Sequence, residues 1–118
     1  MTQFAVGNNN GQVLMKDIRG GVGPLVEINC HTRPIFRLVF SPNCPSLLAS
    51  CANEPDVVVM DVQNENSHII YKDSSHEDFV RGLSWEPKNN RLYSCGWDKL
   101  VKSHLVSNSR MELNGQNP

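Results

Sequence analysis

The sequence contains no long apolar run, because its longest is the four-residue VVVM at 57–60. A helix that crosses a bilayer needs about 20 apolar residues, so we expect no such span. The first residues, MTQFAVGNNNG, show no basic stretch followed by an apolar one, so we expect no secretory signal peptide. The charge is balanced between 11 basic and 12 acidic residues, which predicts neither nucleic acid nor a membrane as a partner.

The sequence also lacks paired cysteines. Its four cysteines form no Cys-x-x-Cys motif and stand at Cys30, Cys44, Cys51 and Cys95. Without a signal peptide, we expect a reducing compartment and free thiols. Structural zinc favours closely spaced pairs of ligands, so we do not expect Cys51, Cys95, His76 and His104 to bind it. Cys51 and Cys95 are interpreted as core-filling residues at equivalent repeat positions.

Helical signals are scarce, since no long stretch repeats apolar residues with a period of 3.6. The chain instead has about ten short β-rich runs, separated by turn residues such as GNNNG, SPNCP and EPKNN. We therefore predict an all-β fold. The GNNNG at 7–11 lacks the Lys-Ser/Thr of a phosphate-binding loop and is predicted to be a tight turn.

The runs repeat with a period of about 45 residues. FAVGNNNGQVLMKD aligns with LASCANEPDVVVMD and with YSCGWDKLVKSHL, and HTRPIFRLVF aligns with HEDFVRGLSW. The matched positions are Phe4, Leu48 and Tyr93; Gly7, Cys51 and Gly96; Asn10, Glu54 and Asp98; Val13, Val57 and Val101; and His31 and His76. Four short strands per unit, each unit opened by a His, predict a WD-repeat β-propeller.

Residues 31–106 resemble the last two blades of the WD-repeat subunit of the methylosome. The stretches that carry the resemblance are LLAS, VVVMD, SHEDFVRGLSWEP and CGWDKLVKSHL, and FAVGNNNGQV is similar to the preceding blade. The resemblance implies about two and two-thirds blades of a seven-bladed ring. The chain would then be a C-terminal piece, as a fragmentary gene model, a short isoform or a diverged paralogue. We expect the second to outer strands of one blade at 1–30, a complete blade at 31–75, a last blade without its outer strand at 76–106, and a flexible tail at 107–118.

The resemblance implies a non-catalytic adaptor that binds a type II protein arginine methyltransferase and presents histone or Sm protein substrates for snRNP assembly. It also implies a cytoplasmic and nuclear location, no cofactor, and no direct contact with nucleic acid or membrane. The alternative is a truncated propeller fragment, or a generic WD-repeat adaptor, without independent function. Cut blades favour this alternative because they expose unpaired edges and uncovered faces.

His76 lies in SSHEDF, where Ser, His and Asp fall within four residues. A nucleophilic triad needs neighbours in space rather than in sequence, so we expect no catalytic residue here. In the repeat, the opening His is expected to hydrogen-bond Ser94 on the second strand and Asp98 in the following turn. Such a buried network must be fully paired, and it fixes the strand register.

His31, Ser50 and Glu54 occupy the matching positions of the preceding blade. Glu is one methylene longer than Asp, which predicts a weaker or water-bridged network there. His104 and Met60 stand where the third strand of the repeat normally ends in Trp, and both are interpreted as packing residues.

Trp97 lies in the turn between the second and third strands of the last blade, and such turns open onto one rim of a propeller. A large aromatic residue on a rim is a candidate anchor for a partner. It can equally cover the neighbouring blade, and neither interpretation is favoured. Arg33, Arg37 and Arg81 lie in or just before the inner strands, where they either meet an acidic partner or remain solvated.

Overall fold

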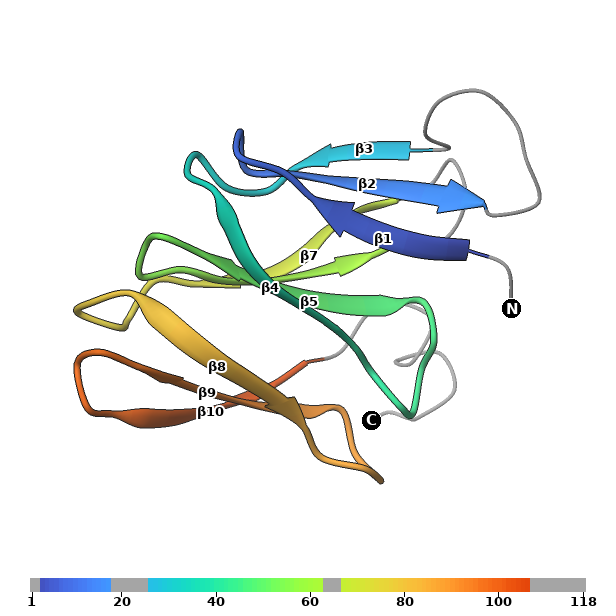
Figure 1. The fold of residues 1–118 in the computed structure, drawn as a ribbon. Helices are drawn as coiled ribbons and strands as arrows, with labels where there is room; N and C mark the ends of the chain where they lie inside the picture. The colour runs from blue at the N-terminus through green and yellow to red at the C-terminus, as the bar shows by residue number, and fades with distance from the viewer. Residues whose placement is uncertain (1–2, 18–25, 63–66, 107–118) are drawn as a thin grey trace.

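The computed structural model describes residues 3–17, 26–62 and 67–106. Within these ranges every regular element is a β-strand, and the strands form three antiparallel sheets arranged side by side (Figure 1). The prediction of an all-β, propeller-like fold is therefore confirmed. The tail expected at 107–118 lies outside the described residues. In the described part of the chain, no helix is long and apolar enough to cross a membrane.

Each sheet is a meander in which consecutive strands are neighbours. The first sheet has β1 (Gln3–Gly7), β2 (Gln12–Asp17) and β3 (Val26–Asn29). The second has β4 (Ile35–Phe40), β5 (Leu47–Ala52), β6 (Val57–Asp61) and β7 (His68–Asp73). The third has β8 (Val80–Trp85), β9 (Arg91–Gly96) and β10 (Val101–Leu105).

The second sheet is covered on both faces, which explains its continuous apolar strands. Every residue of β5 and β6 is buried, whereas β9 alternates between buried and exposed positions. Leu47, Ala49 and Val57 pack against the third sheet, while Leu48 and Val58 pack against the first. A strand buried on both faces has no solvent side, so it needs no polar alternation.

The turns after β1, β3, β5, β7 and β9 gather on the left in Figure 1, and we call this side the left rim. The inner strands β4 and β8 each carry a β-bulge near this rim, between Ile35 and Arg37 and between Val80 and Gly82. A bulge leaves one residue outside the ladder and re-aims its side chain. The turns after β4 and β8 lie on the opposite, right rim.

The strand register corrects two matches of the sequence alignment. Cys51 pairs with Val57 and Cys95 pairs with Val101, so Cys95, not Gly96, is the equivalent of Cys51. Leu92, not Tyr93, is likewise the equivalent of Leu48, since both lie three places before these cysteines. The cause is one residue fewer in the turn after β8 than in the turn after β4. The repeat therefore advances 45 residues between Arg37 and Gly82 but 44 between their partners Cys51 and Cys95.

Candidate functional site

A chain of hydrogen bonds links five side chains across the third sheet. His76 Nδ1 lies 2.8 Å from Asp98 Oδ2, and His76 Nε2 lies 2.9 Å from Ser94 Oγ. Ser94 Oγ lies 2.7 Å from His104 Nε2, and His104 Nδ1 lies 2.8 Å from the Tyr71 hydroxyl. Tyr71 belongs to β7, so the chain also joins the third sheet to the second.

With both imidazoles neutral, one arrangement of protons satisfies every member of this chain. The Asp98 carboxylate accepts from His76 Nδ1–H, so His76 Nε2 accepts the Ser94 O–H. Ser94 then accepts from His104 Nε2–H. His104 Nδ1 accepts from the Tyr71 hydroxyl, which lies nearer to it than to its other partner, Asp73 Oδ2, at 3.3 Å. Every proton is donated in the direction of Asp98, and no hydroxyl is left over to act as a nucleophile.

The electrostatics agree with this arrangement. Burial lowers the pKa of His104, which favours its neutral form. Burial raises the pKa of Asp98, but hydrogen bonds from the Glu77 N–H and from His76 outweigh it and hold that pKa below its usual value. Ser94 is 1% exposed and His76 is 3% exposed, so neither side chain can meet a substrate. The arrangement therefore suits a structural network rather than a catalytic triad.

His104 is not the packing residue that the sequence suggested. It is 2% exposed, yet both of its ring nitrogens have hydrogen-bond partners. Its Nε2–H donates to Ser94 from the position that the repeat usually gives to Trp, another N–H donor. Met60, the equivalent residue of the second sheet, is fully buried among apolar side chains, as expected.

The corresponding network of the second sheet is shorter and looser. His31 Nε2 lies 2.8 Å from Ser50 Oγ, but His31 Nδ1 lies 3.5 Å from Glu54 Oε1, beyond an ordinary hydrogen bond. Met60 cannot donate as His104 does, so the chain of strong bonds ends at Ser50. This weaker network agrees with the prediction made from Glu54, which stands where the third sheet has Asp98.

The turn that carries Glu54 differs for a backbone reason. Its next residue is Pro55, whose ring fixes φ at a negative value. The residues at the same turn position of the other two sheets, Gly11 and Lys99, have φ values of 82° and 67°. Pro55 cannot adopt this conformation, so the second sheet presents its carboxylate from a differently shaped turn.

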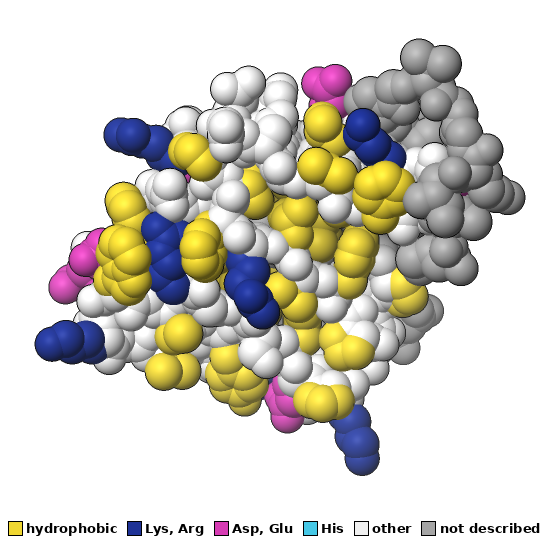
Figure 2. Space-filling model, viewed as in Figure 1, with side chains coloured by type: hydrophobic (Ala, Val, Ile, Leu, Met, Phe, Trp, Pro, Cys, Tyr) yellow, Lys and Arg dark blue, Asp and Glu magenta, His cyan; other side chains and the backbone are white. Residues whose placement is uncertain are grey.

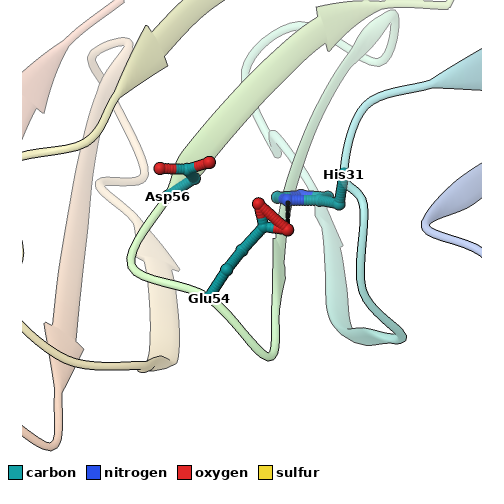
Figure 3. Close-up of side chains that lie close together, drawn as sticks. All are labelled: His31, Glu54 and Asp56. Carbon is teal, nitrogen blue, oxygen red and sulfur yellow. Dashed lines mark ion pairs between the residues drawn. The ribbon is translucent and has the colours of Figure 1, made fainter.

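His31, Glu54 and Asp56 form a group whose ligand atoms all lie within 4.8 Å of one another (Figure 3). One imidazole and two carboxylates are ligands that Zn²⁺ or Mn²⁺ accepts. Burial lowers the pKa of His31 to about 4, and burial together with Asp56 raises the pKa of Glu54. The Lys72 ammonium lies 3.7 Å from Asp56 and already offsets its charge. The geometry admits a metal ion, but the Lys72 ammonium already offsets one of the two carboxylate charges.

Only one of the two cysteines interpreted as core residues, Cys51 and Cys95, is in the core. Cys51 is fully buried between the second and third sheets, and burial raises its pKa to about 11. Cys95 is exposed, contrary to the core-filling prediction. It lies at the equivalent position, but on the face of the third sheet that no described sheet covers.

That uncovered face repeats the pattern of a covered one. Ala49, Cys51 and Val57 are fully buried because the third sheet covers them. Their equivalents in the third sheet include Tyr93 and Val101, which are 39% and 74% exposed. A cavity of about 260 Å³ opens on this face, lined by Arg37, Gly82, Leu83, Ser84, Tyr93, Ser94, Cys95 and Val101. In the first sheet, at the other end of the row of sheets, Phe4 and Val6 on β1 are also exposed.

A second cluster lies on the left rim, where Arg81 is surrounded by three aromatic rings. Its guanidinium carbon lies 4.2 Å from the centre of the Phe36 ring, 4.7 Å from that of Trp97 and 5.1 Å from that of Phe79. Arg81 Nη2 donates to Asn53 Oδ1 at 2.6 Å. We call these five residues the arginine clamp.

The clamp brings together two of the four residues predicted to contact a partner. Trp97 is 60% exposed and packs against Phe79, with ring centres 5.5 Å apart. Arg33 and Arg37 are exposed, but within the described ranges no ring contact joins them to the clamp. The sequence analysis missed Phe36, although it lies 45 residues before Arg81, at the same repeat position.

Comparison with known proteins identifies the repeat. Residues 67–103 match the family described as WD domain, G-beta repeat. Residues 67–103 are therefore a WD repeat. In fold, it matches the crystal structure of the computationally designed Ika8 protein with a TM-score of 0.76, over 90% of this chain and 31% of that one. The two sequences are 22% identical, so this match concerns the fold alone.

Three relatives carry more sequence similarity. Methylosome protein WDR77 of Xenopus laevis is 31% identical over 111 residues, which cover 92% of this chain and 32% of the relative. The peroxisomal targeting signal 2 receptor of Dictyostelium discoideum is 37% identical over 62 residues, 52% of this chain and 20% of the receptor. WD repeat-containing protein YPL247C of Saccharomyces cerevisiae is 35% identical over 82 residues, 68% of this chain and 16% of that protein. The chain thus spans a third or less of each relative.

Proposed function

We propose that this chain supplies blades of a non-catalytic WD-repeat scaffold that binds a protein arginine methyltransferase. The observation that carries the proposal is the 31% identity to the methylosome protein, because it extends over 92% of this chain. Residues 1–30, 31–75 and 76–106 would be successive blades. Histones and Sm proteins are the proposed substrates of the enzyme, and the cytoplasm and nucleus the proposed location.

The contacts of the polar residues support a scaffold. His76 and Ser94 are buried and use their hydrogen-bonding groups on each other and on their neighbours. The exposed Trp97 and the clamp around it lie on the surface instead. Buried polar groups that fix the register and exposed aromatic residues on a rim are features of a binding module.

Co-purification with a type II arginine methyltransferase tests the proposal. The tagged chain should retain the enzyme, whereas the matching segment of the Dictyostelium receptor, which shares the repeat, should not. The purified chain alone should transfer no methyl group to a histone or Sm peptide. Equal retention by both segments, or methyl transfer by the chain itself, would contradict the proposal.

A fragment without independent function is the second candidate, and the two exposed apolar faces favour it. Phe4 and Val6 at one end, and Tyr93, Val101 and Leu105 at the other, leave apolar surface open to solvent. Gel filtration with amide hydrogen exchange distinguishes the candidates. A monomer with protected β5 and β6 amides supports a binding module, whereas an aggregate without protection supports the fragment.

A further inference from the structure

We propose that the arginine clamp binds a carboxylate of an acidic, partly apolar segment in a partner protein. The inference rests on the proposed function only in taking the chain as a binding module. It adds the place of contact, the residue that makes it and the chemistry of the partner. The clamp consists of Phe36, Asn53, Phe79, Arg81 and Trp97.

Two β-bulges build the clamp. Phe36 and Arg81 are the residues that the bulges of β4 and β8 leave outside the ladder, near the same rim. Because they belong to adjacent sheets, the Phe36 ring comes to lie over the Arg81 guanidinium. The clamp spans two sheets that are both present, so no further blade is needed to form it.

The clamp orders the guanidinium, and its remaining N–H groups can still donate to a ligand. The rings of Phe36 and Trp97 lie against it, and the Asn53 amide oxygen accepts one of its N–H groups. A second N–H reaches the Val80 carbonyl at 3.4 Å. A guanidinium has five N–H groups, arranged as a fork that matches a carboxylate. Since the side chain is already ordered, a carboxylate bound at its edge incurs less loss of side-chain entropy.

The surroundings favour an acidic protein segment with apolar residues over other partners. Phe36 and Trp97 are 53% and 60% exposed, and they offer apolar surface beside the cation. Figure 2 shows hydrophobic and Lys/Arg side chains next to one another on the left of the same view. An arginine-rich tail would bring like charge to Arg81.

Acidic residues near the clamp in the sequence reduce the long-range attraction of an acidic segment to this rim. Glu77 and Asp78 are exposed in the connection before β8, close in sequence to Phe79 and Arg81. Asp78 accepts the N–H of Phe79 at 2.7 Å. With these carboxylates next to Phe79 in the sequence, an acidic segment gains little from net charge. Binding must therefore depend on directed contact with Arg81.

Fluorescence anisotropy with the full chain tests this inference. The probe is a short labelled peptide of alternating Glu and Leu, and its counterpart has Gln in place of Glu. The Glu peptide should bind saturably, and Arg81→Ala and Arg81→Lys should each weaken it by about tenfold or more, since Lys lacks the planar fork. Trp97→Ala should also weaken it.

The matched control is Arg91→Ala, which removes the same charge at the start of β9, where Arg91 contacts Ser103 and Glu86. This variant should bind like the parent, and thermal unfolding should show that all variants are folded. Equal losses from Arg81→Ala and Arg91→Ala, equal binding of the Gln peptide, or tighter binding of an oligouridine would overturn the inference. Capture of the methyltransferase that is indifferent to Arg81→Ala would sink this inference alone. Peptide binding through Arg81 without capture would sink only the methyltransferase proposal.

Discussion

Replacing Ser94 with Ala removes the hydroxyl at the centre of the hydrogen-bond chain in the third sheet. Ser94 is 1% exposed and bonds His76 at 2.9 Å and His104 at 2.7 Å. The variant loses both bonds and leaves two imidazole nitrogens buried without partners. Each unsatisfied buried group costs about 1–3 kcal/mol, so we expect unfolding to require about 3 kcal/mol less.

The chain contains its own control, Ser50→Ala in the second sheet. Ser50 is fully buried and has one strong bond, to His31, with a weak contact to Cys30 Sγ at 3.9 Å. Its loss should cost about 1–2 kcal/mol, roughly half as much. The variant His104→Met copies the Met60 arrangement into the third sheet. In that background, Ser94→Ala should cost no more than Ser50→Ala does in the parent.

Urea denaturation followed by far-ultraviolet circular dichroism measures these differences, if the slope of the transition stays constant between variants. In thermal unfolding, about 3 kcal/mol corresponds to a decrease of roughly 10 °C in Tm for a chain of this size. Equal losses for Ser94→Ala and Ser50→Ala would refute the reasoning. Additive effects of Ser94→Ala and His104→Met would also refute it, because linked groups should not act independently.

Three further predictions follow from the described contacts. The His31 pKa falls from 6.5 to about 4 on folding, so its contribution to the free energy of unfolding is complete above pH 6.5 and is lost as the pH falls toward 4. In His31→Gln, the pH dependence of the urea midpoint should be weaker, by an amount equivalent to about 3 kcal/mol at most. An unchanged pH dependence would contradict this. In native labelling with iodoacetamide, mass spectrometry should find the exposed Cys95 modified first and the buried Cys51 only after unfolding; early labelling of Cys51 would argue against its position between the sheets. EDTA and Zn²⁺ should leave Tm unchanged, and a zinc-dependent rise that Glu54→Gln removes would instead assign a metal site to this cluster.

The sequence predicts the sheets well because its signals are local. Alternating apolar residues, turn residues and the repeat period indicate the strands without knowledge of their neighbours. Leu48 was matched with Tyr93, 45 residues later, instead of with Leu92. The error arose because Leu92 and Tyr93 are neighbours and are both apolar. Only the ladder shows that the turn after β8 is one residue shorter and that Leu92 is buried.

The polar contacts are harder to predict because they join distant parts of the chain. Tyr71 and His104 are 33 positions apart and lie in different sheets. His104 therefore resembles a packing residue until β10 is placed beside β9. The clamp depends on two bulges, and a bulge changes the direction of a side chain without any residue type that marks it. Trp97 was predicted to lie in a turn on one rim, as an anchor or as cover, and its contacts with Phe79 and Arg81 required the structure.

The register also shows where this protein tolerates a change of chain length. The spacing from Gly7 to Val13, from Cys51 to Val57 and from Cys95 to Val101 is the same, and the spacing from Ile28 to Ile35 equals that from Asp73 to Val80. All these connections cross the left rim, whereas the one-residue difference after β4 and β8 lies on the right rim. A loop grafted near Asn43 would therefore leave the strand register unchanged. The same graft beside Trp97 would displace Asp98 from His76. The right rim is the side for inserting a tag or a reporter, and the left rim admits changes of side chain only.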